Sequence, residues 1–435
     1  MTKFSDLGLA ESVLRALTTE GYETPTPIQA QAIPPLLAGH DLLGIAQTGT
    51  GKTCAFAAPL ITRLLQYPEH PRPKQTRILV LAPTRELAAQ IGESFKAYGR
   101  FAGLRIATVF GGVGFGPQVA ALTRGLDVLV ATPGRLLDHM QQGNLRLEGT
   151  SAVVLDEADH MLDLGFLVPI RKIFSKLPKR RQTLFFSATM PSEIATLAGE
   201  MLHQPSKVSV TPVAKTADLV SQRVILCEAK RKREILVDLL QNPDFSRSIV
   251  FTRTKRGADR VASALIDAGL TAEAIHGNKS QGQRTRALDG FKAGRVAVLV
   301  ATDIAARGID VDAVSHVVNF ELPEVPEAYV HRIGRTARAG ADGAAISLCD
   351  HEERDLLRAI EKLTKQTIPS TDMRLSPHTP DDAPVVKKPA PRSGRPPNRA
   401  APTGQRPAPR RDGEKARPPR AASEGRPRDG RQARR

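Results

Sequence analysis

Short apolar runs alternate with amphipathic stretches along this chain, up to about Leu363. Each run ends at a polar residue or at a glycine- or proline-bearing segment. Apolar runs of this kind predict strands buried on both faces, and the stretches between them predict helices. We therefore expect parallel sheets covered by helices, with ligands at the carboxyl ends of the strands. The runs are Asp41–Ile45, Ile78–Ala82, Val128–Ala131, Ala152–Leu155, Thr183–Phe186, Ile249–Phe251, Ala272–Ile275, Val296–Ala301 and Val317–Val318.

The two halves of the chain echo each other. Val128–Thr132 recurs as Val298–Thr302, which suggests two similar folds in tandem. The polar, proline-punctuated stretch from Gln204 to Asp218 predicts the boundary between them. The expected organisation is α/β, with doubly wound parallel-sheet domains at 31–208 and 219–368 and a linker at 209–218.

The carboxyl-terminal part of the chain has a different composition. Residues 381–435 hold 11 prolines, and 16 Lys and Arg against 6 Asp and Glu, which gives +10 of the whole chain's +17. With hardly any large apolar residue, such a segment cannot bury enough surface to offset its ordering entropy, so a disordered basic tail is expected at 369–435. The surplus of arginine indicates a polyanionic partner, nucleic acid first. A merely solubilising extension is the alternative.

The chain shows no sign of a secretory or membrane segment. No run of about 18 uncharged apolar residues occurs, and Met1–Val13 mixes acidic with apolar residues. The scattered Cys54, Cys227 and Cys349 predict neither a disulfide framework nor a metal cluster. A cytoplasmic location without membrane contact is expected.

A phosphate-binding loop is predicted directly after the run Asp41–Ile45. Backbone N–H groups of such a glycine-rich loop can wrap a polyphosphate, Lys52 can neutralise its β and γ oxygens, and the Thr53 hydroxyl can hold Mg²⁺. Alanine stands where the general pattern has its first glycine. The loop consists of Ala46, Gln47, Thr48, Gly49, Thr50, Gly51, Lys52 and Thr53.

A second phosphate-handling motif, Asp156–Asp159, follows the run Ala152–Leu155. Asp156 at the carboxyl end of a strand suits Mg²⁺, and Glu157 is placed to orient or deprotonate a water. A glycine turn beside a charged surface loop would be the alternative, and the pairing of the two motifs argues against it.

The second half contributes an arginine-rich segment, His331–Arg338. Arg335 and Arg338 are three residues apart, so a helix would turn both to one side. Two guanidinium groups from outside the first domain can contact a transferring phosphoryl group as arginine fingers. A solvated basic helix face is the alternative, and it is weak beside the two phosphate motifs.

Together these motifs closely resemble those of the DEAD-box RNA helicases, over roughly residues 4–365. That family's own phosphate loop begins with alanine, and Asp156–Asp159 supplies the family name. His331–Arg338 resembles the sixth motif, with Ala337 in place of the usual glycine. The resemblance implies tandem RecA-like domains with ATP and Mg²⁺ bound between them. Several strings are similar to the bacterial RhlE-type subgroup, namely Phe110–Val113 with Pro117–Gln118, Phe251–Lys255, and His276–Gln281 with Arg284–Arg286.

The resemblance also implies roles for residues outside the two phosphate motifs. Segment 1–30 resembles the adenine-recognition motif, in which Gln29 reads the adenine edge and Phe4 packs on its ring. Asp310, in a segment that resembles the family's fifth motif, is implied to contribute to nucleotide binding. Coupling of nucleotide state to RNA is implied for Asp159, Ser187, Thr189 and His331. The implied RNA-binding residues are Pro83, Thr84, Arg85, Gly111, Gly112, Thr132, Pro133, Gly134, Arg135, Arg253, Gly277, Thr302 and Arg307.

The implied function is an RNA-dependent ATPase that separates short RNA duplexes, or remodels RNA–protein complexes, without reading sequence. Hydroxyls, glycine N–H groups and guanidinium groups with few aromatics suit a phosphodiester path. An ATP-gated RNA clamp or assembly platform would use the same motifs. A DNA translocase is disfavoured by the adenine motif, and an inactive RNA-binding protein by the presence of Lys52, Glu157, Arg335 and Arg338. Ribosome-assembly or RNA-decay proteins are further expected partners.

Overall fold

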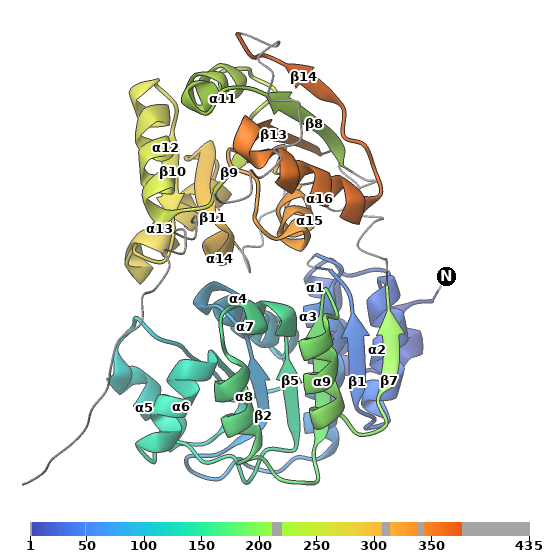
Figure 1. Ribbon diagram of the computed structural model, residues 1–435. Helices are drawn as coiled ribbons and strands as arrows, with labels where there is room; N and C mark the ends of the chain where they lie inside the picture. Colours follow the sequence, from blue (N-terminus) through green and yellow to red (C-terminus); the bar gives the residue numbers. More distant parts are fainter. Residues whose placement is uncertain (1, 48, 211–219, 307–313, 337–342, 376–435) are drawn as a thin grey trace, which may run out of the picture. The chain divides into compact units, whose positions relative to one another are not determined.

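The computed structural model describes residues 2–47, 49–210, 220–306, 314–336 and 343–375. Within these residues, two seven-stranded parallel sheets form, one in each half of the chain (Figure 1). We call the parts built around them the first lobe and the second lobe. The strand orders are β3-β4-β2-β5-β6-β1-β7 and β10-β11-β9-β12-β13-β8-β14. The predicted α/β fold with two doubly wound sheets is confirmed.

The strands of the first lobe are β1 (Leu42–Ile45), β2 (Thr76–Leu81), β3 (Ile106–Val109), β4 (Leu126–Ala131), β5 (Ala152–Leu155), β6 (Gln182–Ser187) and β7 (Ser206–Ser209). Those of the second are β8 (Ser221–Leu226), β9 (Ser248–Thr252), β10 (Ala272–Ile275), β11 (Val298–Thr302), β12 (His316–Asn319), β13 (Ala344–Cys349) and β14 (Ser370–Asp372).

The two sheets have the same strand order when the strands are numbered within each lobe. Strand β4 lies between β3 and β2, and β11 lies in the same place between β10 and β9. The sequence echo between Val128–Thr132 and Val298–Thr302 therefore falls on equivalent strands. Two copies of one fold explain it.

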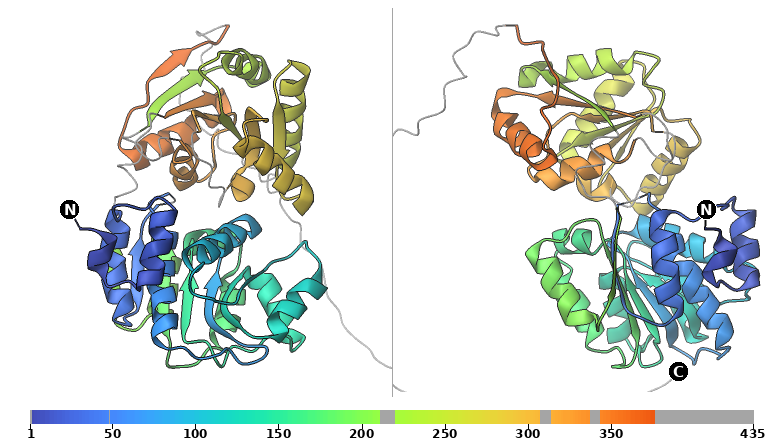
Figure 2. Two further views of the ribbon diagram at one scale, coloured as in Figure 1. Left: turned by 180° about the vertical axis from the view of Figure 1, so that it is seen from behind. Right: turned by 90° about the vertical axis from the view of Figure 1, so that its right-hand side faces the viewer.

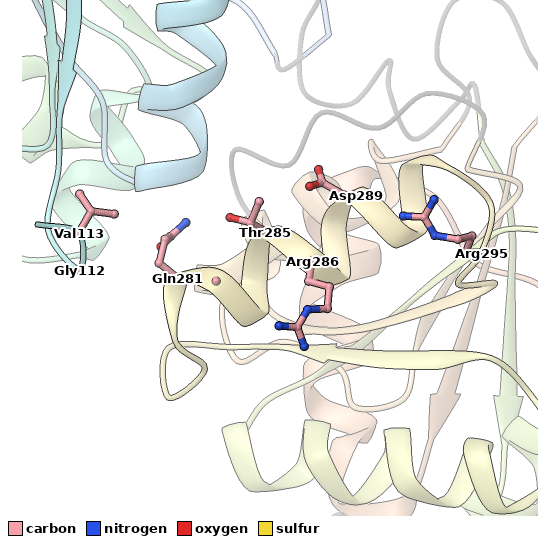
Figure 3. A pocket seen from close by; sticks show the side chains of 8 residues that line it. Gly112, Val113, Gln281, Thr285, Arg286, Asp289 and Arg295 are labelled. Atoms are coloured by element: carbon pink, nitrogen blue, oxygen red, sulfur yellow. The ribbon is translucent and has the colours of Figure 1, made fainter.

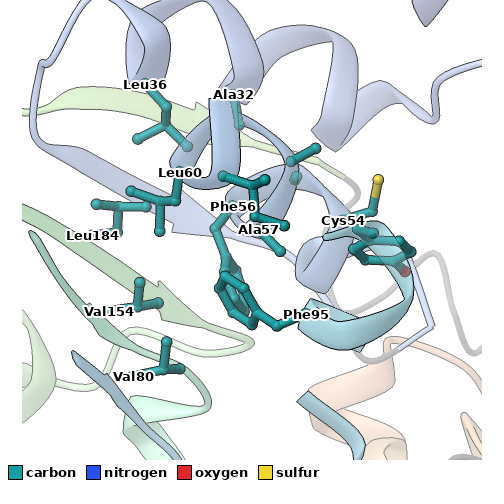
Figure 4. Close-up of a cluster of buried hydrophobic side chains, with 14 of the residues drawn as sticks. Ala32, Leu36, Cys54, Phe56, Ala57, Leu60, Val80, Phe95, Val154 and Leu184 are labelled. Carbon is teal, nitrogen blue, oxygen red and sulfur yellow. The ribbon is translucent and has the colours of Figure 1, made fainter. Parts of the chain in front are cut away.

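Helices cover both faces of the first sheet, as the right-hand view of Figure 2 shows. Along β2, Ile78 and Val80 belong to the core under α1 to α4, whereas Leu79 and Leu81 belong to the core under α5 to α9. Figure 4 shows part of the former core. The helices are η1 (Phe4–Leu7), α1 (Glu11–Thr19), α2 (Pro27–Leu37), α3 (Lys52–Gln66), α4 (Arg85–Tyr98), α5 (Phe115–Thr123), α6 (Pro133–Gln141), α7 (Ala158–Asp163), α8 (Leu167–Phe174) and α9 (Ser192–Met201).

The second sheet is covered in the same manner. Side chains of α11 and α12 pack into one core and those of α13 to α16 into another. The helices are η2 (Ala229–Arg231), α11 (Lys232–Leu240), α12 (Lys255–Asp267), α13 (Gln281–Lys292), α14 (Asp303–Ala306), α15 (Pro326–Ile333), η3 (His351–Glu353) and α16 (Arg354–Thr364). No helix among the described residues is long and apolar enough to cross a membrane.

Two expected boundaries differ from the structure. Helix α2 runs through the boundary expected at residue 30, and its Ile28 and Ile33 are fully buried in the first lobe's core, so segment 1–30 is part of that lobe. The tail was expected to start at residue 369, but Ser370–Asp372 pair with β8 as the edge strand β14. All residues of β14 are exposed, which is why no apolar pattern marks it. Residues 376–435, the rest of the expected tail, lie outside the described part.

Candidate active site

The two phosphate motifs follow neighbouring strand ends of the first lobe. Strand β6 lies between β1 and β5, and all three run in parallel, so their carboxyl ends meet at one edge of the sheet. The loop after β1 carries Ala46–Gly51, Asp156 follows β5 directly, and Ser187 ends β6. The sheet thus brings together motifs that are about a hundred residues apart in sequence.

The phosphate loop wraps into the start of α3. Gly49 and Gly51 have positive φ angles of 82° and 91°, which favour glycine. Lys52 is 6% exposed, and its Nζ donates to the carbonyl of Ala46 at 2.9 Å. The Thr50 hydroxyl donates to the carbonyl of Gln47 at 2.8 Å. Lys52 is therefore held inside the loop, where a polyphosphate could replace its carbonyl partner.

The expected adenine reader contacts this loop from α2. Gln29 is 1% exposed; its Oε1 accepts from the backbone N–H of Thr26 at 2.8 Å, and its Nε2 donates to the carbonyl of Gly51 at 3.2 Å. The Thr26 hydroxyl donates to the carbonyl of Thr50 at 2.8 Å. A Cβ on Gly51 would lie 2.4 Å from Gln29 Nε2, a second reason for glycine there. Gln29 therefore links the amino-terminal segment to the phosphate loop.

The expected ring partner of adenine, Phe4, is 5% exposed and packs into the first lobe's core. Its ring meets Tyr22 edge-on at 6.2 Å between centroids, and Tyr22 meets Tyr98 in the same way at 5.7 Å. An aromatic cluster anchors η1 to the lobe. The role of Phe4 in adenine binding stays a prediction.

Asp156 and Glu157 form a buried carboxylate pair. Burial raises the pKa of Asp156 to about 6. The positive charge of Lys52 opposes this rise, and repulsion from Glu157 adds to it. Burial would also raise the pKa of Glu157, but a hydrogen bond from His160 and the charges of Lys52 and His160 lower it to about 2. Glu157 is thus held as the anion that a base for water requires.

The residues present fit Mg²⁺. A buried carboxylate that is costly to ionise alone, such as Asp156, is stabilised by a bound cation. The described residues contain no group of three or more His, Cys, Asp or Glu arranged for a metal. Mg²⁺ is commonly bound through one or two protein oxygens, waters and substrate phosphates, so a carboxylate and a hydroxyl suffice on the protein side. Asp156 and Thr53 are the candidate ligands.

Glu157 also has a strained backbone, with φ of 53° and ψ of 55° at the start of α7. A left-handed conformation in a residue other than glycine is uncommon and clusters at functional sites. His160 lies on the same helical turn, and its Nδ1 is 3.4 Å from Glu157 Oε2. Sequence reasoning missed His160, although its spacing of three residues from Glu157 was a usable signal.

Three of the four residues expected to couple nucleotide state to RNA, Asp159, Ser187 and Thr189, are bonded to one another; the fourth, His331, lies on α15 of the second lobe. Asp159 Oδ2 accepts from both the backbone N–H and the hydroxyl of Thr189, each at 2.9 Å. The Ser187 hydroxyl accepts from the backbone N–H of Asp159 at 3.2 Å and donates to the carbonyl of Thr189 at 2.7 Å. These bonds tie α7 to the end of β6 and to the turn after it.

Several expected RNA-binding residues of the first lobe follow strand ends at one edge of the sheet. Pro83 and Thr84 follow β2, and the Thr84 hydroxyl caps α4 by accepting from Leu87 N–H at 3.3 Å. Arg85 reaches the loop after β3, where a Cβ on Gly112 would lie 1.9 Å from its Nη1 and a Cβ on Gly111 3.3 Å from its Nη2. Strands β3, β4 and β2 are neighbours, so the loops after them share one edge. After β4, that edge continues with Thr132, Pro133, Gly134 and Arg135.

We expect Gly112→Ala to weaken RNA binding about tenfold, as the concentration giving half-maximal ATPase stimulation reports. The φ of 79° strains alanine, and its Cβ would displace the Arg85 guanidinium. Gly116→Ala is the matched control, because nothing lies within 4 Å of a Cβ there and its φ is not positive. Equal RNA affinity in both variants would contradict the close approach of Arg85.

In the second lobe, the expected RNA-binding residues also follow strand ends. Arg253 follows β9; its backbone N–H donates to Glu321 Oε2 at 2.7 Å, and its Nη2 is 3.3 Å from Glu353 Oε1. Gly277 follows β10, and Thr302 ends β11. Gln281, Thr285 and Asp289 project along α13, which begins after the Gly277 loop (Figure 3).

The arginine-rich segment is not a continuous helix. Helix α15 carries His331 but ends at Ile333, so the expectation that a helix aligns Arg335 and Arg338 is wrong for Arg335, which lies in the following turn. The Thr336 hydroxyl donates to the carbonyl of Val314 at 2.6 Å, which draws the chain off the helical path. Arg335 is 4% exposed.

Arg332 links the ends of β11 and β12, which lie on either side of β9, a role that sequence reasoning missed. It is 1% exposed, and its Nε and Nη2 donate to the two carboxylate oxygens of Asp303 at 2.5 and 2.8 Å. Its Nη1 donates to Asn319 Oδ1 at 3.1 Å and to the carbonyl of Glu321 at 2.7 Å. No local pattern reveals these long-range pairs.

Four expected site residues, Thr48, Arg307, Asp310 and Arg338, lie outside the described residues.

Comparison with known families and proteins gives consistent matches. The DEAD/DEAH box helicase family matches residues 26–197, and the helicase conserved C-terminal domain matches residues 231–340. The DEAD-box ATP-dependent RNA helicase CshA of Geobacillus kaustophilus is 43% identical over 383 residues, covering 88% of this chain and 80% of that protein. CshA of Bacillus subtilis is 43% identical over 363 residues, covering 83% and 72%. The expected placement in the RhlE-type subgroup finds no support in these relatives.

Solved structures agree with the fold. Dbp5 of S. cerevisiae bound to RNA and ADP BeF3 matches with a TM-score of 0.76 at 31% identity, covering 86% of this chain and 96% of that one. Mss116p bound to ssRNA and AMP-PNP matches with a TM-score of 0.76 at 28% identity, covering 86% and 80%.

Proposed function

This chain belongs to the DEAD-box ATP-dependent RNA helicases, and from that premise we propose how its own residues perform the reaction. The protein is an RNA-dependent ATPase and helicase. The observation that carries the proposal is the meeting of the phosphate loop and the Asp156–Glu157 pair at one sheet edge, where the charge of the buried Lys52 acts on both carboxyls.

The first lobe binds ATP. Loop N–H groups and Lys52 bind the phosphates. Gln29, which is bonded to the carbonyl of Gly51 in the loop, binds the adenine edge. Thr53 and Asp156 would hold Mg²⁺, which neutralises charge on the β- and γ-phosphate oxygens. Glu157, kept anionic in its buried position, orients the attacking water and accepts its proton.

The second lobe completes the site. Arg335, and Arg338 beyond the described residues, stabilise the charge on the transferring phosphoryl group when the lobes close. RNA bound along both lobes favours closure, so hydrolysis depends on RNA. Closure bends one strand away from its partner, and hydrolysis reopens the lobes. Contacts to phosphodiester groups make this separation of short duplexes independent of sequence.

Strand separation and an ATP-gated clamp can be distinguished by one experiment. A short RNA duplex with one labelled strand is mixed with the protein and ATP, and strand release is compared with the lifetime of the complex on single-stranded RNA. A helicase releases the strand at a rate that depends on ATP. A long-lived complex without strand release would favour the clamp or assembly platform.

Deleting residues 381–435 should weaken RNA binding and make it less sensitive to salt. The segment carries a net charge of +10, and each phosphate that it neutralises adds to the salt slope. The measurement is RNA affinity over a series of salt concentrations. A matched variant with the segment's arginines changed to glutamine keeps its length and should behave like the deletion. An unchanged slope would make the tail a spacer or a protein-docking segment.

Three finer points remain predictions. These are the RhlE-type placement, a cytoplasmic location, and partner proteins in ribosome assembly or RNA decay.

The described cysteines Cys54, Cys227 and Cys349 are buried and form no disulfide, and burial raises the pKa of each thiol. They are therefore packing residues.

A further inference from the structure

Helices α5 and α6 adjoin or carry two groups of proposed RNA-binding residues. Helix α5 begins just after the loop Phe110–Gly114, which contains Gly111 and Gly112, and α6 begins with Pro133 and carries Arg135 in its first turn. The two helices are neighbours in the first lobe (Figure 1).

Two buried side chains connect these helices to the glycine loop. Gln118 is 7% exposed, and its Nε2 donates to the carbonyl of Phe110, the residue before Gly111, at 3.0 Å. Because the amide nitrogen of Gln118 is bonded to that carbonyl, its amide oxygen, Oε1, faces His139 and accepts from His139 Nε2 at 3.0 Å. His139 is fully buried, and its Nδ1 has no hydrogen-bond partner among the described residues.

The same histidine supports Arg135 through an aromatic ring. The His139 ring stacks on Phe115, with centroids 4.2 Å apart and an interplanar angle of 22°. The Arg135 guanidinium carbon lies 5.2 Å from the Phe115 centroid. Arg135 Nη1 donates to the carbonyl of Val113 at 3.4 Å, so the arginine also contacts the glycine loop.

Charge keeps this arrangement in one state. Burial lowers the pKa of His139, and the positive charge of Arg135 lowers it further, against a smaller opposing effect from Asp138. The bond to Gln118 requires a hydrogen on Nε2, and the lowered pKa favours the neutral ring that carries its hydrogen there. The ring can therefore lie near a guanidinium without repelling it.

We propose that Gln118, His139 and Phe115 form a positioning unit that fixes the Phe110–Val113 loop relative to Arg135. The glycine N–H groups and the guanidinium then meet RNA as one preformed surface. Preorganisation raises affinity by removing the cost of ordering these groups on binding. The inference rests on the proposed RNA-binding role of Gly111, Gly112 and Arg135.

The test is a double-mutant cycle in the full chain. ATPase stimulation by single-stranded RNA is titrated for His139→Ala, for Arg135→Ala and for both together, and thermal unfolding midpoints are recorded. His139→Ala should raise the half-saturating RNA concentration about fivefold to tenfold, while kcat at saturating RNA and the KM for ATP hold. In the Arg135→Ala background, adding His139→Ala should raise the half-saturating RNA concentration less than twofold. Gln141→Ala, an exposed glutamine at the end of α6, is the control without effect.

Gln118→Ala is the second variant, because it keeps the histidine and removes the bond to the loop. It should raise the half-saturating RNA concentration to a similar extent. A merely structural role would instead lower kcat and the unfolding midpoint together, equally in both backgrounds, and would overturn the inference. Unchanged RNA affinity in Arg135→Ala itself would refute the RNA-binding role of Arg135. A strong effect of Arg135→Ala with none of His139→Ala or Gln118→Ala would refute the positioning unit alone.

Discussion

Glu157→Gln is expected to reduce RNA-stimulated ATP turnover about a hundredfold or more, while ATP and RNA still bind. The amide has the shape of the carboxylate and can occupy the same left-handed backbone position, where φ is 53°. It cannot accept a proton from water. It also loses the negative charge that the bond from His160 and the charge of Lys52 maintain in the native protein.

The measurement is steady-state ATP hydrolysis at saturating RNA, with nucleotide and RNA affinities determined in parallel. Because binding is retained, the variant should accumulate as a stable complex with ATP and RNA. Glu148→Gln, an exposed glutamate in the segment before β5, is the matched control and should turn over normally. Undiminished hydrolysis by Glu157→Gln would remove this residue from its role with the attacking water.

Arg335→Ala is expected to lower RNA-stimulated turnover on the order of a thousandfold, with little change in ATP affinity. The proposed contact forms only when phosphoryl charge is spread in the transition state, so the loss should fall on kcat. Arg335 lies directly after Gly334 at the end of α15, beside the buried Arg332 network. That network gives the segment a fixed base in the second lobe.

Arg335→Lys separates charge from geometry. Lysine keeps the positive charge but lacks the planar fork of donors, so we expect only partial recovery of turnover. Arg358→Ala, on the exposed face of α16, is the matched control for loss of one arginine in the same lobe. RNA stimulation that survives intact in Arg335→Ala would show that another group supplies the transition-state charge.

Apolar runs predict much of the fold, including the edge strand β10, but they do not predict β3, β7, β8, β13 or β14. Strands β2, β4 and β5 are buried along almost their whole length and are readable as apolar runs. The edge strands β7 and β14 have largely polar, exposed residues, so periodicity gives them no signal. Their places are set by pairing with β1 and β8, which only the folded sheet reveals.

The same division holds for the site. Local motifs such as the phosphate loop and Asp156–Glu157 are readable because their chemistry lies in consecutive residues. The bonds of Asp159 to Thr189 and of Arg332 to Asp303 join residues about thirty positions apart, and nothing local announces them. The end of α15 was readable in part, since a glycine such as Gly334 after a helical pattern is a stop signal.

The most direct test of a catalytic centre completed by RNA-driven closure is the ATP hydrolysis rate of the intact chain at saturating ATP. It is measured without nucleic acid and then with single-stranded RNA, duplex RNA or DNA. We predict slow turnover alone, at least about tenfold stimulation by RNA, and little by DNA. Equally fast turnover without RNA would contradict the account.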